Sequence, residues 1–414
     1  MKIKRTPLSL YIHIPFCKKK CLYCDFLSAP ACGQERESYV KALLREISLM
    51  ADGVKDYEVI SVFFGGGTPS LLTGNQMERI MLAVRKEYHL RPDAEITVEC
   101  NPATTDFDKL SFYRECGINR LSIGLQSADD TELKELGRIH TYEQFLETFE
   151  NARKAGFTNI NIDIMSALPG QSYESYMNTL EKVITLSPEH ISAYSLIIEE
   201  GTPFYERYGE ETGGTDNSGK ADLRYPELPD EDTERKMYHA TKSVLEKAGY
   251  LRYEISNYAR KGFECRHNLT YWTGVEYLGV GIGAASYLKG YRFKNCTDRE
   301  EYIGHFLGED NGGLPETKQE GSREPVIFHA LHEEIQSLSA KEQMEEFMFL
   351  GLRLKRGISV AEFTARFGKS PYEVYPGIIE RFRNEKLLLC KDGRICLSKR
   401  GMDVANYVMA EFIL

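Results

Sequence analysis

The sequence predicts an α/β fold in which parallel strands form a partial or full TIM-type (β/α) barrel, followed by a small α+β domain. Three observations support this prediction. Short β-forming segments alternate with amphipathic helical segments over residues 8–197, a rhythm typical of parallel sheets with right-handed crossovers. Polar or glycine-rich groups follow several strands, where barrels bind ligands. Near residue 340 the alternation gives way to helices and a hairpin pattern.

The composition indicates a soluble globular protein. The 414 residues are 42% hydrophobic and 28% charged, which suits about two or three domains of roughly 150 residues each. No run of 18 apolar residues exists, so we expect no membrane span, and the N-terminus does not have the pattern of a secretory signal. We expect a cytoplasmic protein with reduced cysteines. The net charge of −10 argues against a dominant nucleic-acid function.

The first strand, predicted over residues 8–14, leads into a cysteine loop. Cys17, Cys21 and Cys24 have the spacing C-x3-C-x2-C. A cubane iron–sulfur cluster normally takes four cysteine ligands, so three leave one iron open for a small molecule. Zinc, a disulfide and chance are the alternatives, but zinc sites usually pair two such units or add histidines. Cys32 has no matching spacing and is read as a bystander.

The following segments continue the barrel pattern. Their apolar spacing and flanking turn residues distinguish helices from strands. The predicted helices cover 35–50, 76–88, 106–116, 142–155 and 172–186, and the predicted strands cover 59–64, 95–99, 119–123, 159–165 and 190–197.

Functional side chains cluster at the ends of these strands. Glycines 65–67 let the backbone approach a ligand closely. Glu99 and Asp163 can accept hydrogen bonds from hydroxyls or an ammonium group, and Gln126 can donate or accept. Arg138 can pair with a carboxylate. Each residue alone is equally well explained as a cap or turn residue, but together they are expected to converge on one mouth of the barrel.

Beyond the sixth strand the alternation stops. Residues 199–234 form an acidic, Gly-rich excursion that predicts a surface insertion, with a lid as the alternative. A helix over 231–248 and a short strand over 253–256 follow. Residues 279–286 repeat glycine, which favours close backbone packing near the barrel rim over a dinucleotide site.

Residues 267–272 read HNLTYW and contain the only tryptophan. Imidazole is a usual axial ligand of haem iron. A histidine beside aromatic residues is more often part of a core or a cap, so the composition leaves both roles open for His267. Cys265 is a rival ligand or a buried thiol.

Residues 291–339 predict a connector, and residues 340–414 a C-terminal domain. Helices over 341–356, 359–367 and 372–385 precede strands over 387–390 and 394–397, joined by an Asp-Gly turn. Three helices and a hairpin resemble a winged helix, a fold that often binds DNA. This segment holds 13 Lys/Arg against 10 Asp/Glu, too small a surplus for that role, so we expect an interaction or covering domain.

Seven segments, in order, resemble the HemW-type haem chaperones, relatives of the oxygen-independent coproporphyrinogen III oxidases in the radical SAM superfamily. They read YIHIPFCKKKCLYCDF, GGGTPS, VECNP, GLQS, DIMSALPGQ, YEISNYA and HNLTYW. The resemblance covers essentially the whole chain. It implies a radical SAM barrel over residues 1–290, the connector, and a HemN C-terminal-like winged-helix domain over 340–414.

The resemblance also implies a set of ligand-binding residues. Cys17, Cys21 and Cys24 match the ligands of a [4Fe–4S] cluster, and His267 matches the haem-binding motif of the family. The residues that match the S-adenosylmethionine (SAM) contacts are Tyr11, Tyr23, Gly66, Gly67, Thr68, Glu99, Gln126, Arg138, Asp163 and Ile197.

Two departures favour the chaperone branch. The oxidases carry a further cysteine two residues after the third ligand, where this chain has Phe26, and a longer extension ahead of the first strand. The resemblance implies haem binding and delivery to apoproteins, such as respiratory haem enzymes. A homodimer and a peripheral membrane contact are compatible with it. The alternative is an oxygen-independent coproporphyrinogen III oxidase, in which a 5′-deoxyadenosyl radical abstracts hydrogen from a propionate.

Overall fold

The computed structural model describes residues 5–209, 225–308, 316–318 and 326–413. Its first half confirms the predicted alternation of strands and helices. The elements are β1 (Thr6–Ile14), α1 (Gly33–Ala51), β2 (Tyr57–Gly66), α2 (Gly74–Glu87), β3 (Leu90–Cys100), α3 (Phe107–Glu115), β4 (Arg120–Gln126), α4 (Asp130–Glu135), α5 (Tyr142–Lys154), β5 (Ile160–Ser166), α6 (Tyr173–Leu186) and β6 (His190–Ser195).

Helix α4 was missed by the sequence analysis because six residues are too few to display a helical period. Its signal is a cap instead, since the Asp129 carboxylate accepts from the backbone N–H groups of Thr131 and Glu132. The longer α2 and α5 each begin with a threonine capping box.

The elements after β6 extend the sheet at both edges. They are α7 (Pro203–Tyr208), α8 (Glu231–Lys247), β7 (Leu251–Arg252), β8 (Asn257–Ala259), α9 (Arg266–Thr273), β9 (Tyr277–Val280), β10 (Ala285–Leu288), β11 (Tyr291–Asn295), α10 (Arg299–Leu307), β12 (Glu316–Lys318), β13 (Val326–Phe328) and β14 (His332–Ser337).

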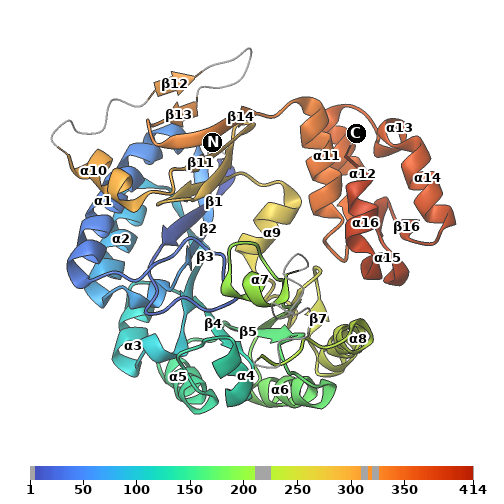
Figure 1. Ribbon diagram of the computed structural model, residues 1–414. Coiled ribbons are helices and arrows are strands. Elements are labelled where there is room, and N and C mark those ends of the chain that lie inside the picture. Colours follow the sequence, from blue (N-terminus) through green and yellow to red (C-terminus); the bar gives the residue numbers. More distant parts are fainter. Residues whose placement is uncertain (1–4, 210–224, 309–315, 319–325, 414) are drawn as a thin grey trace.

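Within the described residues, twelve strands form one sheet in the order β14-β11-β10-β9-β1-β2-β3-β4-β5-β6-β8-β7. Strands β9 and β1 to β6 run parallel, and antiparallel strands flank them on both sides. The order is linear, with β14 at one edge and β7 at the other. The predicted barrel is therefore a partial one, with α1 to α6 along its outer side (Figure 1).

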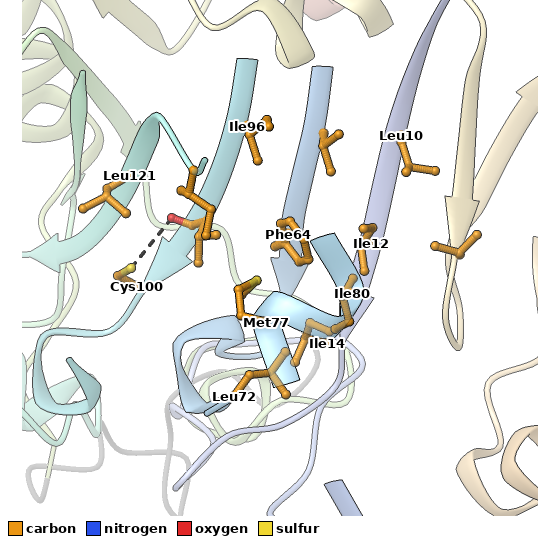
Figure 2. Close-up of a cluster of buried hydrophobic side chains, with 14 of the residues drawn as sticks. Leu10, Ile12, Ile14, Phe64, Leu72, Met77, Ile80, Ile96, Cys100 and Leu121 are labelled. Carbon is orange, nitrogen blue, oxygen red and sulfur yellow. Dashed lines mark hydrogen bonds between the residues drawn. The ribbon is translucent and has the colours of Figure 1, made fainter. Parts of the chain in front are cut away.

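Alternation along β1 separates a core face from a ligand face. Leu10, Ile12 and Ile14 are fully buried and point to one side of the sheet, because alternate residues of a strand share a face. Met77 and Ile80 of α2 pack in the same cluster (Figure 2). The intervening residues of β1 face the inside of the partial barrel.

Three predictions are wrong in detail. Residues 253–256 are the turn of the β7–β8 hairpin, because the buried Glu254 carboxylate accepts from the Ser256 N–H and the Asn257 side chain. Residues 291–339 are not a separate connector, since β11 and β14 belong to the large sheet. The expected boundary at 290 falls in the β10–β11 hairpin turn, where Lys289 and Gly290 both have positive φ.

The excursion at 199–234 is not simply a solvated insertion in its described parts. Phe204 of α7 is fully buried, and its backbone N–H donates to the carbonyl of Leu22 in the cysteine loop. The Gly170 N–H donates to the Glu227 carbonyl. The remainder of the excursion, residues 210–224, lies outside the described residues.

The C-terminal unit has its own hydrophobic core. Met348, Phe363, Phe382 and Ile395 are among its buried members. Pro376 divides the predicted third helix because proline disfavours helical backbone in the preceding residue. The elements are α11 (Ala340–Gly351), β15 (Ile358–Ser359), α12 (Val360–Phe367), α13 (Pro371–Val374), α14 (Pro376–Asn384), β16 (Leu388–Lys391), β17 (Arg394–Leu397), α15 (Lys399–Asp403) and α16 (Ala405–Ala410).

This unit packs against the partial barrel through α9. The Arg353 guanidinium lies 4.3 Å from the centroid of the Trp272 ring, and the Lys355 N–H donates to the Tyr253 carbonyl at 3.0 Å. Among the described residues, every helix is too short or too polar to cross a lipid bilayer.

Two substitutions on α2 test the assignment of its core face. Ile80 is fully buried, whereas Leu82 is 56% exposed. We expect Ile80→Ala to lower the free energy of unfolding by about 2–5 kcal/mol, and Leu82→Ala by about 0.5 kcal/mol or less. Urea unfolding followed by circular dichroism measures both. Equal losses would contradict the orientation of α2.

Candidate functional site

A cavity of about 370 Å³ lies at the C-terminal ends of the parallel strands. The cysteine loop after β1 forms one wall, and the ends of β2 to β6 form the others. It unites most residues proposed from the sequence: Cys17, Cys21, Tyr23, Cys24, Gly66, Gly67, Thr68, Glu99, Gln126, Arg138, Asp163 and Ile197.

The three loop cysteines are free thiols of intermediate exposure. Cys17 Sγ lies 3.5 Å from Thr68 Oγ1, and an Arg138 nitrogen lies 3.7 Å from Cys21 Sγ. Burial raises the pKa of Cys24 to about 11, so this thiol becomes a thiolate at neutral pH only beside a cation. Three thiols at one cavity wall fit a cationic iron–sulfur group, which binds deprotonated cysteine.

The glycine turn after β2 is shaped by its contact with the end of β1. Gly66 has φ of +108°, and a Cβ there would meet the His13 ring at 2.5 Å. A Cβ at Gly67 would lie 2.7 Å from the Phe16 carbonyl oxygen. Both glycines are therefore required by packing within the chain, and their backbone also lines the cavity.

Two half-buried carboxyl groups, Glu99 and Asp163, form the acidic side of the cavity. Burial, followed by the nearby Asp163, raises the pKa of Glu99 to about 8, against a partial offset from the Gly66 N–H. Burial also raises the pKa of Asp163, although its carboxylate accepts from Asn161 at 2.7 Å and Ser122 at 3.1 Å. A ligand that carries a positive charge would stabilise both ionised groups.

Gln126 and Arg138 form the adjoining polar wall. Gln126 adopts a positive φ of 71°, and its side-chain oxygen accepts from the Tyr194 hydroxyl at 3.3 Å. Arg138 donates to the Gly124 carbonyl at 2.6 Å, while its buried Nε has no partner among the described residues. A guanidinium with spare donors suits a ligand carboxylate.

Tyr11, Tyr23 and Ile197 occupy different depths. Tyr23 lines the cavity, with its ring 6.4 Å from that of Phe204. Ile197 lies at the rim and is 66% exposed. Tyr11 does not line the cavity. The Tyr11 hydroxyl lies 3.1 Å from His13 Nδ1. The Tyr11 ring and the Glu99 carboxylate both lie beside the Cα atom of Gly65, where a side chain would meet them.

His267 lies apart from the cavity, at the N-terminus of α9. It is 1% exposed, its ring stacks on Phe63, and its two nitrogens lie 3.0 Å from Ser61 Oγ and 2.9 Å from the Tyr271 hydroxyl. Burial lowers its pKa to about 3. The imidazole is therefore neutral and fully hydrogen-bonded. Cys265 is also buried, with its thiol 3.5 Å from a Glu95 oxygen.

Several cavity residues were missed by the sequence analysis. Ser122 and Gly124 precede Gln126 on alternate positions of β4 and line the same cavity, so period-two spacing back from a strand-end residue was an available signal. Tyr194 and Ser195 are the last two residues of β6 and also line the cavity. Lys19, Lys20 and Asn101 come from loops, where no such period applies.

The fold and cavity define a protein of the radical SAM superfamily. The model of that superfamily matches residues 11–183, and the model of the HemN C-terminal domain matches residues 338–404. The solved structure of the coproporphyrinogen III oxidase HemN from Escherichia coli, a radical SAM enzyme, superposes with a TM-score of 0.78 at 21% identity. It covers 99% of this chain and 90% of that one, which confirms the fold.

Relatives of higher identity specify the family. Heme chaperone HemW of Lactococcus lactis is 36% identical over 99% of this chain and 98% of its own length. Heme chaperone HemW of Bacillus subtilis is 33% identical over 98% of this chain and 99% of its own. The mouse mitochondrial radical S-adenosyl methionine domain-containing protein 1 is 34% identical over 86% of this chain and 75% of its own. The chain belongs to the HemW family.

Substitution of Glu99 tests the electrostatics of the cavity. Because the folded-state pKa of Glu99 is about 8 against an ordinary 4.5, the native state retains a proton that the unfolded chain has lost. This contribution to stability is complete below the unfolded value and disappears as the pH rises through 8. We expect Glu99→Gln, which cannot ionise, to lose less thermal stability than wild type between about pH 6 and about pH 9.

The control is Glu147→Gln on the exposed face of α5, which should keep the wild-type pH dependence. Unfolding midpoints of the cofactor-free protein by circular dichroism give the comparison. A Glu99→Gln profile parallel to wild type would show that this carboxyl group is not perturbed.

Proposed function

We propose that this protein binds a [4Fe–4S] cluster and SAM in the strand-end cavity, and that it binds haem and delivers it to apoproteins. The observation that carries the proposal is the convergence of three thiols, a glycine turn, two half-buried carboxyl groups and a half-buried guanidinium on one cavity. Membership of a family whose members are named heme chaperones supports the haem part.

In this proposal Cys17, Cys21 and Cys24 hold the cluster, which supplies an open iron and redox capacity when bound. Arg138 binds the SAM carboxylate, and the acidic pair of Glu99 and Asp163 accepts from its amino group or ribose hydroxyls. Gly66, Gly67 and Thr68 present backbone to the methionyl end. Tyr11 supports Glu99 from behind, while Tyr23, Gln126 and Ile197 border the remainder of the ligand.

For haem, we propose a second cavity of about 230 Å³ between α9 and the C-terminal unit. Its aromatic walls include Tyr271, Trp272 and Phe347, which suit a porphyrin face, and Arg356 and Arg366 suit propionates. His267 does not line this cavity, but its Nε2 is hydrogen-bonded to Tyr271, which does. Ligation of iron by His267 therefore requires Tyr271 to release it; the imidazole is already neutral, as a ligand must be.

Haem-accepting apoproteins, a homodimer and a peripheral membrane contact remain predictions from the family resemblance, and a cytoplasmic location remains a prediction from the composition.

The second candidate function is oxidation of coproporphyrinogen III by radical chemistry. The likeness of fold to the oxidase HemN and the convergence of most predicted ligand residues on the strand-end cavity favour it. Phe26 weighs against it, because this 60% exposed side chain stands at the cavity where the oxidases carry a further cysteine.

Cysteine substitutions test the cluster. We expect Cys17→Ala, Cys21→Ala and Cys24→Ala each to lose the cluster. Three thiolates ligate three of the four irons, so the loss of one thiolate would leave two irons without a protein ligand. Cys32→Ala is the matched control, since Cys32 is an exposed free thiol near the same loop. Iron and sulfide per chain after anaerobic reconstitution decide the outcome. Full iron content in any of the first three variants would remove that cysteine from the ligand set.

A paired assay separates the two functions. Anaerobically reconstituted protein is incubated with coproporphyrinogen III, SAM and a low-potential reductant, while haem is titrated into a parallel sample. We expect haem binding without protoporphyrinogen formation. Substrate-dependent decarboxylation with release of 5′-deoxyadenosine would overturn the chaperone proposal and leave the fold and cluster assignment intact.

The same titration examines the haem ligand. His267→Ala should weaken haem binding or shift the Soret band. Tyr271→Phe should preserve or tighten it, because this change removes the hydroxyl bonded to Nε2. His239→Ala, at a partly exposed histidine of α8, should bind as wild type does. An unchanged spectrum and affinity in His267→Ala would exclude His267 as the ligand.

A further inference from the structure

Three buried side chains outside both cavities bring metal-binding atoms together. Glu46 lies in α1, His332 is the first residue of β14, and His329 lies three residues before it. Their exposed fractions are 0%, 4% and 8%. Neither the strand-end cavity nor the proposed haem cavity includes them.

The donor atoms are close enough to share one ion. One carboxylate oxygen of Glu46 and one nitrogen from each histidine all lie within 4.8 Å of one another, and the two imidazole centroids are 3.6 Å apart. Zinc bonds of about 2.0–2.2 Å place two ligand atoms of a tetrahedral ion about 3.4 Å apart. Shifts of about 1 Å or less therefore complete the site.

Three hydrogen-bond donors orient the Glu46 carboxylate and leave one of its acceptor positions free of them. Its Oε2 accepts from the Gly281 N–H at 2.7 Å and from the Tyr302 hydroxyl. Its Oε1 accepts from Asn295 Nδ2 at 2.5 Å. A carboxylate has about four acceptor directions, and the fourth faces His329. Such an arrangement of outer hydrogen bonds is how proteins fix a ligating carboxylate.

The contacts that an ion would replace are long. His329 Nε2 lies 3.3 Å from Glu46 Oε1, and the His329 backbone N–H lies 3.3 Å from His332 Nδ1. Both contacts are longer than a usual hydrogen bond of about 2.9 Å, so an ion bound by His329 Nε2 and His332 Nδ1 would replace weak contacts with metal–ligand bonds.

The charge balance also favours a cation. In the part of the chain that the structure describes, no lysine or arginine pairs with Glu46, and the basic group beside it is the His329 imidazole, whose Nε2 lies 3.3 Å from Glu46 Oε1. A fully buried carboxylate is normally paired with a positive group or bound to a metal.

We propose that Glu46, His329 and His332 form a binding site for a divalent first-row transition ion of the Zn²⁺ class. Two imidazoles and one carboxylate are a usual donor set for such ions. The site would tie β14, at one edge of the sheet, to α1 on its outer side (Figure 1). This inference does not depend on the proposed function, since it uses none of the same residues.

Zinc binding to the iron-loaded protein tests the site. With the cysteine loop occupied by reconstituted iron–sulfur cluster, full-length protein is incubated with Zn²⁺ alone and desalted. Metal per chain is then measured, and zinc K-edge absorption identifies the ligand atoms. We expect one zinc per chain in a nitrogen and oxygen shell with imidazole scattering, and a higher unfolding midpoint with zinc than without.

Variants identify the ligands. Glu46→Gln, which keeps the side-chain volume, and the double change His329→Ala with His332→Ala should lose the zinc and the zinc-dependent rise in midpoint. His305→Ala is the control: this histidine of α10 lies 6.1 Å from His329 between ring centroids but outside the donor group, and should retain both.

Absence of zinc from the desalted wild type, a shell of sulfur alone, or full retention by the ligand variants would overturn the proposal. If the ligand variants do not fold, the wild-type stoichiometry and ligand shell decide.

Discussion

The parallel pairing of β1 with β2 continues beyond the strands themselves, and the strand-end cavity depends on it. The Gly67 N–H donates to the Ile14 carbonyl at 2.9 Å, and the Thr68 N–H donates to the Phe16 carbonyl at 2.7 Å. These two bonds hold the start of the cysteine loop against the glycine turn, so that Cys17 Sγ lies 3.5 Å from Thr68 Oγ1. A side chain at Gly67 would collide with this backbone, which explains why glycine is needed there independently of any ligand.

The cavity separates opposite charges within a buried volume. On one side Asp163 makes ionisation of Glu99 more costly, and on the other Arg138 lies beside the Cys21 thiol. In a medium of low polarity, acidic and basic groups cost free energy when no charged partner faces them. A bound ligand with matching charges stabilises them. A molecule with an ammonium group and a carboxylate complements both sides, and SAM has both.

Aromatic packing connects this cavity with the region around α9. The Tyr11 ring, beside the cavity wall, has its centroid 6.3 Å from that of His267, and Phe63 stacks on the same histidine. The Tyr271 hydroxyl contacts the same histidine, and Tyr271 also lines the cavity between α9 and the C-terminal unit. Arg353 on Trp272 then fixes that unit to α9. The histidine is thus a buried link between two cavities, which the hexapeptide HNLTYW could not reveal.

The sequence by itself determined the chemistry of the strand-end cavity and the order of its strands and helices. Both depend on local features: cysteine spacing, helical and strand periodicity, and polar residues at strand ends. Only the tertiary structure decided that the barrel stays open, that β11 and β14 join its sheet, and that His267 faces inward. It alone brought His329 to Glu46, 283 positions apart. Such contacts arise from long-range packing and strand pairing, whose energies no local pattern encodes.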